Sequence, residues 1–346
     1  MATDEPTTNG EPQRPTIGGV LPRFVITNFP LLPEDQQRLR AALGADSLLM
    51  TMGSEALREA LVAHPETDTL LAFTPPTDLL TLAPNLRWLA LASAGAEHVL
   101  RMGFAQARPS LTITTASGVH GVPISEFVLS VLLIWTRRWR EILAAQDARE
   151  WPASQMALLG GELDSATLGI IGLGAIGRRI AQLGRAFGMR VVAQRRSTTP
   201  GQTDPDVDEL LPPDRLADLL GQADYVVLSA PNTAETRHLI TAERLREMKR
   251  SAVLINIARG DLVDEAALIA ALRDGVIAGA GLDVFATEPL PADSPLWSMP
   301  NVILSPHISG VTLRYSQRLT TLFLENVARL RAGQPLRNVV DPARGY

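Results

Sequence analysis

Three polar side chains each follow a short apolar run, at a place where a parallel sheet would carry its chemistry. They are Arg259, Glu288 and His307, and the runs before them are Ala252–Ile255, Ala280–Val284 and Val302–Leu304. Ligands meet a doubly wound sheet at the carboxyl ends of its strands, so we expect the three side chains at one edge. A guanidinium holds carboxylates, and an imidazole exchanges protons near neutral pH. The set predicts binding of an acid and transfer of a proton.

Each of the three residues also has a simpler interpretation. Arg259 can belong to a turn that enters a helix, Glu288 can be a solvated loop acid, and His307 can be a packed histidine. Only His307 follows a strand of this series directly; the other histidines are His64, His98, His120 and His238. The simpler interpretations lose weight if the same series of elements also carries a nucleotide site.

Such a site is predicted by a glycine-rich turn that lies between the apolar run Ala166–Ile171 and an amphipathic helix pattern. In a dinucleotide-binding turn, Gly172 would allow the tight turn, Gly174 would let the backbone approach a pyrophosphate, and Gly177 would allow close helix packing. A lone turn of this kind can be a mere connection. Its position between a strand and a helix favours a nucleotide cofactor.

The residues after the next predicted strand bear on the choice of cofactor. An acid that binds the ribose is expected there, but the sequence reads Arg195, Arg196 and Ser197, and no acid occurs before Asp204. Guanidinium groups attract a 2′-phosphate, whereas a carboxylate would repel it. The sequence therefore predicts NADPH in preference to NADH, with NADH still possible. The alternative is that the two arginines are a solvated loop pair.

The elements that must position these groups alternate between strands and helices, which predicts parallel sheets covered by helices. The expected strands are Arg23–Thr27, Thr69–Phe73, Leu86–Leu91, Leu111–Thr114, Ala166–Ile171, Arg190–Ala193, Tyr225–Ser229, Ala252–Ile255, Ala280–Val284 and Val302–Leu304. Residues 124–151 predict one long helix that is apolar on nearly all sides in its first half. A helix of that kind needs neighbours on several sides, such as a second domain or subunit.

Composition narrows the class of protein. The 346 residues suggest two domains, and 46% hydrophobic residues can form a sizeable core. The net charge of −5 offers no basic excess for nucleic acid, and the absence of cysteine removes disulfides and thiolate metal sites. No apolar run is long enough to cross a membrane. We expect a cytoplasmic protein with no metal and no nucleic-acid or membrane partner.

Several stretches together resemble the D-isomer-specific 2-hydroxyacid dehydrogenase family, in particular its glyoxylate and hydroxypyruvate reductases. They are Gly169–Gly177, Asn256–Glu265, Gly281–Phe285, Glu288–Leu290 and Ser305–Gly310. The resemblance implies an α/β protein in which a Rossmann coenzyme domain, residues 120–309, is inserted into a flavodoxin-like substrate domain, residues 22–119 and 310–346. It also implies an active site in the cleft and a homodimer built through the coenzyme domain. Residues 1–21 are expected to be a flexible leader.

The resemblance also implies roles for single residues. His307 would give a proton to the alkoxide formed by hydride transfer to a 2-oxo acid, Glu288 would orient it, and Arg259 would hold the substrate carboxylate. With Ala94 and Gly95 of the carboxylate-binding loop, Arg259 and His307 would bind the substrate. Asp283 would contact the nicotinamide amide. The residues expected to contact the cofactor are Gly172, Gly174, Ala175, Ile176, Gly177, Arg195, Arg196, Ser197, Pro231, Thr236, Ile257, Ala258, Arg259, Asp283, His307 and Gly310.

Other functions within the same fold stay open. The family's corepressor-like proteins sense nucleotides and keep the same triad, so the triad alone does not exclude a nucleotide-sensing interaction protein. A phosphoglycerate dehydrogenase is less favoured because many of these carry a regulatory domain after the residue that corresponds to Tyr346. A formate dehydrogenase is less favoured because an acid would be expected in place of Arg195. His120 could face the cleft, although a structural role is the simpler expectation.

Overall fold

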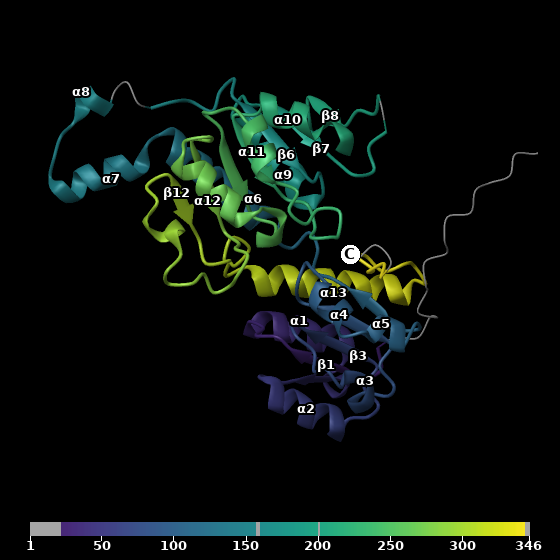
Figure 1. Cartoon of the computed structure of the whole chain (residues 1–346). Coiled ribbons are helices and arrows are strands. Elements are labelled where there is room, and N and C mark those ends of the chain that lie inside the picture. The colour runs from purple at the N-terminus through teal and green to yellow at the C-terminus, as the bar shows by residue number, and fades with distance from the viewer. Residues whose placement is uncertain (1–21, 157–159, 200, 343–346) are drawn as a thin grey trace, which may run out of the picture. The chain divides into compact units, whose positions relative to one another are not determined.

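The computed structural model describes residues 22–156, 160–199 and 201–342. These form two compact units (Figure 1). The first unit combines the described residues up to Val119 with those from Leu313 onward, and the second unit spans His120–Thr312. The predicted leader, residues 1–21, lies outside the described residues.

The first unit is a parallel sheet with helices on both faces. Its strands are β1 (Val25–Asn28), β2 (Leu48–Met50), β3 (Thr69–Ala72), β4 (Trp88–Leu91) and β5 (Thr112–Thr114), and among the described residues they pair in the order β2-β1-β3-β4-β5. This is the strand order of flavodoxin-like sheets. Its helices are α1 (Pro33–Leu43), α2 (Ser54–Ala63), α3 (Leu79–Leu82), α4 (Glu97–Arg101), α5 (Phe104–Ala107) and α13 (Tyr315–Arg331), with a 3₁₀ turn at Ala45–Ser47.

The second unit has the strand order of a dinucleotide-binding domain. Its strands are β6 (Thr167–Ile171), β7 (Arg190–Gln194), β8 (Glu209–Leu211), β9 (Tyr225–Leu228), β10 (Val253–Asn256), β11 (Gly279–Leu282) and β12 (Val302–Leu304). In the described part of the chain they pair in parallel in the order β12-β11-β10-β9-β6-β7-β8. The chain direction across the sheet reverses between β6 and β9, the switch point where such folds bind ligands. The predicted fold class is confirmed.

The helices of the second unit are α6 (Gly121–Thr136), α7 (Trp139–Ala148), α8 (Ala153–Met156), α9 (Ala175–Ala186), α10 (Leu216–Gln222), α11 (Ala242–Glu247) and α12 (Glu265–Arg273), with 3₁₀ turns at Pro213–Arg215, Gly260–Leu262 and Pro295–Ser298. They lie on both faces of this sheet, except for α7 and α8, which take no part in its two cores among the described residues. Neighbouring strand residues enter different cores: Leu254 packs into one cluster, while Val253 and Ile255 pack into the other. Strands covered on both faces are apolar at nearly every position, which explains the long apolar runs of the sequence.

The prediction of one continuous helix over residues 124–151 is wrong, because the chain forms two helices, α6 and α7, in this region. The chain leaves α6 at Thr136, and Arg138 takes a left-handed conformation with φ of 57° before α7 begins. α6 lies so close to β11 that a Cβ on Gly279 would be 2.0 Å from the Trp135 ring, and one on Gly281 would be 2.6 Å from Val131. The neighbours of its apolar face are thus the sheet and α9 of its own unit, while Glu126 is exposed.

Two strands were missing from the sequence prediction. They are β2 and β8, each three residues long and each at one edge of its sheet. Only one residue of each, Leu48 and Leu211, is fully buried. A run of three residues, even an apolar one such as Leu48–Met50, is too short to show the periodicity that distinguishes a strand from other structure.

Candidate active site

The glycine-rich turn between β6 and α9 has the geometry of a phosphate-binding turn. Gly172 has φ of 102°, and a Cβ there would lie 2.6 Å from the backbone nitrogen of Ala230. A Cβ on Gly177 would lie 2.2 Å from the Gly172 carbonyl oxygen, so both positions require glycine. Gly174, the N-cap of α9, has no described atom within 4 Å of where its Cβ would be, and no side chain caps the helix. This open helix end at Ala175 and Ile176 fits a pyrophosphate.

The arginines predicted to select the cofactor lie beside this turn. The amide of Gly172 donates to the carbonyl of Gln194, the last residue of β7, which sets the turn next to Arg195. The guanidinium of Arg195 lies 3.5 Å from Asp204, and that of Arg196 lies 3.5 Å from Glu235. Both belong to the segment after β7 where such folds recognise the ribose and its 2′-substituent. Ser197 is exposed in the same segment.

The loop after β9 is held by its own side chains. Thr236 Oγ1 donates to the Pro231 carbonyl at 2.7 Å and accepts from the Thr233 amide at 2.8 Å. Pro231 is exposed and Thr236 is half-buried, at the carboxyl end of the strand next to β6. The geometry therefore puts both on the edge of the sheet that carries the glycine turn.

Arg259 is positioned by an asparagine that the sequence analysis did not single out. Asn256, 1% exposed at the end of β10, donates from Nδ2 to the Arg259 carbonyl at 2.9 Å and accepts at Oδ1 from the Ala258 amide. Ile257 and Ala258 are buried in this tight turn. The only sequence signal for Asn256 is a polar residue that ends an apolar strand.

Glu288 and His307 form a direct pair. His307 Nδ1 lies 2.7 Å from Glu288 Oε2, while Glu288 Oε1 accepts from the Phe285 amide at 3.0 Å. His307 takes a left-handed backbone conformation with φ of 56°, and its side chain is 49% exposed. Because Nδ1 is bonded to the carboxylate, Nε2 is the ring nitrogen that can exchange a proton with a substrate.

Asp283 lies beneath the loop that carries His307. Its carboxylate, 1% exposed, accepts from the amides of Ile308 at 2.9 Å and Ser309 at 3.2 Å, and from the Ser309 hydroxyl. A buried carboxylate with these partners holds the His307 loop in place. The family resemblance implied a contact of Asp283 with the nicotinamide amide, whereas its contacts with the His307 loop were not predicted.

The strand order brings the three predicted catalytic residues to one edge. Arg259, Glu288 and His307 follow β10, β11 and β12, which are adjacent parallel strands. Gly310 lies in the same loop as His307, and a Cβ there would be 2.7 Å from the ring of His120. Ala94 and Gly95 belong to the first unit, in the loop after β4, where the Ser93 hydroxyl donates to the Gly95 carbonyl.

Within the described ranges, no group of three or more His, Asp or Glu side chains is arranged to hold a metal ion. No helix of the described residues combines the length and the hydropathy needed to span a membrane.

Comparisons with known proteins agree with this geometry. Residues 129–309 match the family model described as D-isomer specific 2-hydroxyacid dehydrogenase, NAD binding domain. The chain is 36% identical over 285 residues to a glyoxylate reductase of Aeropyrum pernix, an alignment that covers 79% of this chain and 82% of that protein.

Two solved structures are similar over almost their whole length. A D-isomer specific 2-hydroxyacid dehydrogenase from Xanthobacter autotrophicus, in complex with NADPH and MES, has a TM-score of 0.78 and 30% identity, covering 94% of this chain and 100% of that one. An NADPH-dependent glyoxylate/hydroxypyruvate reductase from Sinorhizobium meliloti, in complex with NADP and sulfate, has a TM-score of 0.77 and 29% identity, covering 93% and 99%.

Proposed function

Because the chain belongs to the D-isomer specific 2-hydroxyacid dehydrogenase family, whose members use NAD(P), we propose that it is an NADPH-preferring reductase of small 2-oxo acids. Glyoxylate and hydroxypyruvate are the substrates we propose first, since the similar proteins are named for them. The observation that carries the proposal is the 2.7 Å hydrogen bond between His307 and Glu288. These two residues follow β12 and β11, and Arg259 follows the adjacent strand β10.

The side chains supply what reduction of a 2-oxo acid requires. The bound nicotinamide supplies the hydride. His307 donates the Nε2 proton to the carbonyl oxygen as the hydride arrives at the carbon, and in the reverse direction takes it back. Glu288 holds Nδ1, which fixes the orientation of the ring. Arg259 binds the substrate carboxylate and polarises the carbonyl.

The proposed preference for NADPH rests on Arg195, with Arg196 and Ser197 beside it. Exchange of Arg195 for aspartate would place a carboxylate where the 2′-phosphate is expected, so Arg195→Asp should lower the ratio of kcat/KM for NADPH to that for NADH by about tenfold or more. Steady-state kinetics with both cofactors measures this ratio. An unchanged ratio would show that Arg195 does not contact the phosphate.

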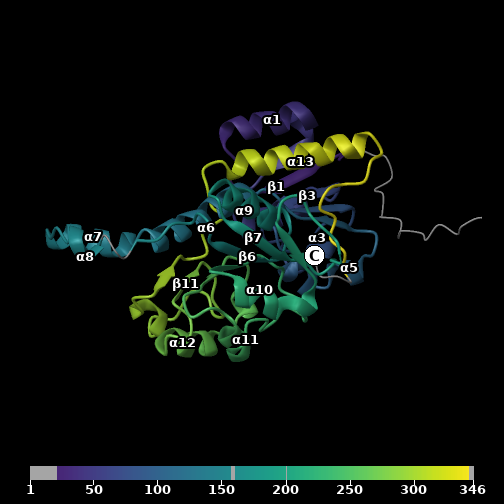
Figure 2. The same cartoon turned by 90° about the horizontal axis from the view of Figure 1, so that it is seen from above.

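We propose that the protein is a homodimer through α7. This helix has no buried residue, and it extends away from the sheet of its own unit (Figure 2). Trp139 is 46% exposed and Leu143 is 50% exposed, and Trp151 beyond the helix is 93% exposed. Exposed aromatic and aliphatic side chains on one projecting helix mark an association surface, and a second copy of the chain presents the same helix. Separately from the dimer, we propose that the protein is located in the cytoplasm.

One assay tests the proposed activity. NADPH oxidation is followed with a panel of 2-oxo acids that includes glyoxylate, hydroxypyruvate and larger 2-keto acids. We expect turnover of at least one of these acids. If the protein binds NADPH but turns over none of them, the proposed enzymatic activity is refuted. The similar proteins are named as enzymes, so nothing supports the nucleotide-sensing interaction protein as an alternative.

A further inference from the structure

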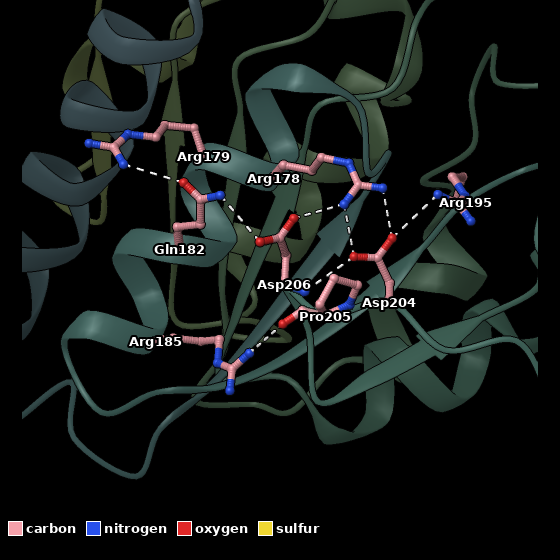
Figure 3. Close-up of polar contacts among 8 residues, drawn as sticks. All are labelled: Arg178, Arg179, Gln182, Arg185, Arg195, Asp204, Pro205 and Asp206. Atoms are coloured by element: carbon pink, nitrogen blue, oxygen red, sulfur yellow. Dashed lines mark hydrogen bonds and ion pairs between the residues drawn. The ribbon is translucent and has the colours of Figure 1, made fainter.

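Arg195, the side chain proposed to bind the 2′-phosphate, belongs to a network of two arginines and two aspartates (Figure 3). Arg178 comes from the first turn of α9, Arg195 directly follows β7, and Asp204 and Asp206 lie in the segment between β7 and β8. None of these four residues was assigned a contact with another by the sequence analysis. The network connects the helix of the glycine turn to the segment that selects the cofactor.

The two arginines bind Asp204 very unequally. Arg178 holds both carboxylate oxygens of Asp204, at 2.8 Å and 2.7 Å, and it also binds Asp206 at 2.7 Å. Arg195 reaches only one oxygen of Asp204, at 3.5 Å. This contact is longer than the ~2.7–2.9 Å usual for a hydrogen bond between a guanidinium and a carboxylate, and is therefore weak. Among the described residues, the buried Nε of Arg195 has no hydrogen-bond partner.

Burial makes the pairing with Arg178 necessary. The side chain of Asp204 is 5% exposed, and a carboxylate that far from water needs a cation to stabilise it. The Arg178 guanidinium keeps the pKa of Asp204 below its usual value, so the carboxylate is charged at neutral pH. Conversely, the helix dipole disfavours a cation in the first turn of α9. The two aspartates explain why Arg178 is tolerated there.

We propose that Arg178 is a specificity-determining residue for NADPH, because it occupies both oxygens of Asp204 and so keeps Arg195 available for the 2′-phosphate. Without Arg178, the nearest cation to the buried carboxylate is Arg195, which would close the 3.5 Å gap and form a tight pair. The carboxylate would then compete with the phosphate for Arg195 and repel it as well. This inference rests on the proposed function, in which Arg195 contacts the 2′-phosphate.

The test measures cofactor binding directly, and the ratio of kcat/KM for NADPH to that for NADH is determined for the same variants. Dissociation constants of NADPH, NADH and adenosine 2′,5′-bisphosphate are determined by calorimetry for the wild type and for Arg178→Gln. We expect NADPH and the bisphosphate to bind about tenfold more weakly to the variant, the effect of weakening one charge-assisted hydrogen bond, while NADH binding stays unchanged. The double variant Arg178→Gln/Asp204→Asn should recover most of the lost affinity, because the competing carboxylate is gone.

A matched control separates this role from simple tethering of the segment. Arg185, on the same helix, donates to the Pro205 carbonyl at 2.7 Å, so it also connects α9 to the segment, and it contacts no carboxylate of the residues that the structure describes (Figure 3). Arg185→Gln should leave the preference for NADPH unchanged. An equal loss in Arg185→Gln would show that Arg178 acts only by holding the segment in place.

Asp204→Asn tests the same inference in a variant that keeps Arg178 and its bond to Asp206. NADPH should bind at least as tightly as to the wild type. Selective weakening of NADPH would mean that Asp204 positions Arg195, and would overturn the inference, as would a double variant that does not recover. If Arg195→Asp itself leaves the cofactor ratio unchanged, the failure lies in the proposed function. If Arg195→Asp lowers the ratio and Arg178→Gln does not, the inference about Arg178 has failed while the proposed function stands.

Discussion

At the level of single residues, His307 depends on two carboxylates with different tasks. Glu288 is hydrogen-bonded to the imidazole ring of His307. Asp283 instead accepts hydrogen bonds from the backbone amides of Ile308 and Ser309, the two residues that follow His307. The second contact matters because His307 has a left-handed backbone conformation, which the surrounding structure must maintain. The proposed proton donor is thus oriented from both the side chain and the main chain.

Replacement of His307 by alanine removes the proposed proton donor but no contact of the glycine turn. We expect kcat for reduction of glyoxylate to fall by about 10²–10⁴-fold, while the dissociation constant of NADPH changes by no more than a few-fold. Stopped-flow or steady-state assays give kcat, and fluorescence titration gives the affinity. A large loss of NADPH binding with kcat preserved would contradict the assigned role.

At the level of elements, close backbone approaches decide how the loops after β10 and β11 meet. A Cβ on Gly260 would lie 1.9 Å from the carbonyl carbon of Phe285. The Arg259 turn and the Glu288 loop can therefore pack together only with glycine at this position. In the first unit, α13 is fastened to the end of β4 by the hydroxyl of Tyr315, which donates to the Ala92 carbonyl.

Gly260→Ala should push the Arg259 turn away from the Phe285 loop. The overpacking is expected to destabilise the protein by about 1–3 kcal/mol and to raise KM for the 2-oxo acid, because Arg259 is displaced. Chemical denaturation and kinetics measure the two effects. Gly221→Ala is the matched control, since its Cβ would meet no described atom closer than 3.7 Å. Equal effects of both substitutions would rule out the close approach as the cause.

Tyr315 predicts a loss of stability in alkali. Burial raises its pKa from 10.0 to about 12. Between these values the unfolded chain releases the proton while the folded chain retains it, so the free energy of unfolding falls as pH rises, by about 2–3 kcal/mol in total. Tyr315→Phe removes this dependence, although loss of the bond to Ala92 costs about 1 kcal/mol at neutral pH.

The measurement for Tyr315 is urea unfolding of the wild type and of Tyr315→Phe at a series of pH values between 10 and 12. The difference between the two proteins isolates Tyr315 from Tyr225, whose pKa is also raised by burial. Stability curves that stay parallel over this range would show that Tyr315 does not cause the loss.

At the level of the whole molecule, the chain folds into two units that each cover a parallel sheet with helices, and one of them is made of segments from both ends of the described chain. Such sheets close their own hydrophobic cores on both faces. α7 takes no part in these cores among the described residues, which is why the proposed dimer is expected to form through it.

Leu143→Glu should therefore shift the protein from dimer to monomer. A charge in the centre of an apolar interface is costly, because it is desolvated without a partner. Light scattering after size exclusion should give a mass near that of one 37.3 kDa chain for the variant and twice that for the wild type. Val62→Glu, at a side chain 66% exposed on α2, is the control and should not change the mass. A wild-type monomer would end the dimer proposal.

The parallel sheets, the glycine turn and the positions of Arg259, Glu288 and His307 after their strands could all be predicted from the sequence alone. These follow from local patterns: buried strands are apolar throughout, and parallel strands present their carboxyl ends at one edge. Only the tertiary structure decided the contacts of Asp283 with Ser309 and of Arg178 with Asp204, the break at Arg138, and the edge strands β2 and β8. Ion pairs between distant residues depend on how loops pack, and short edge strands are specified by their neighbours. Neither leaves a periodic signal along the chain.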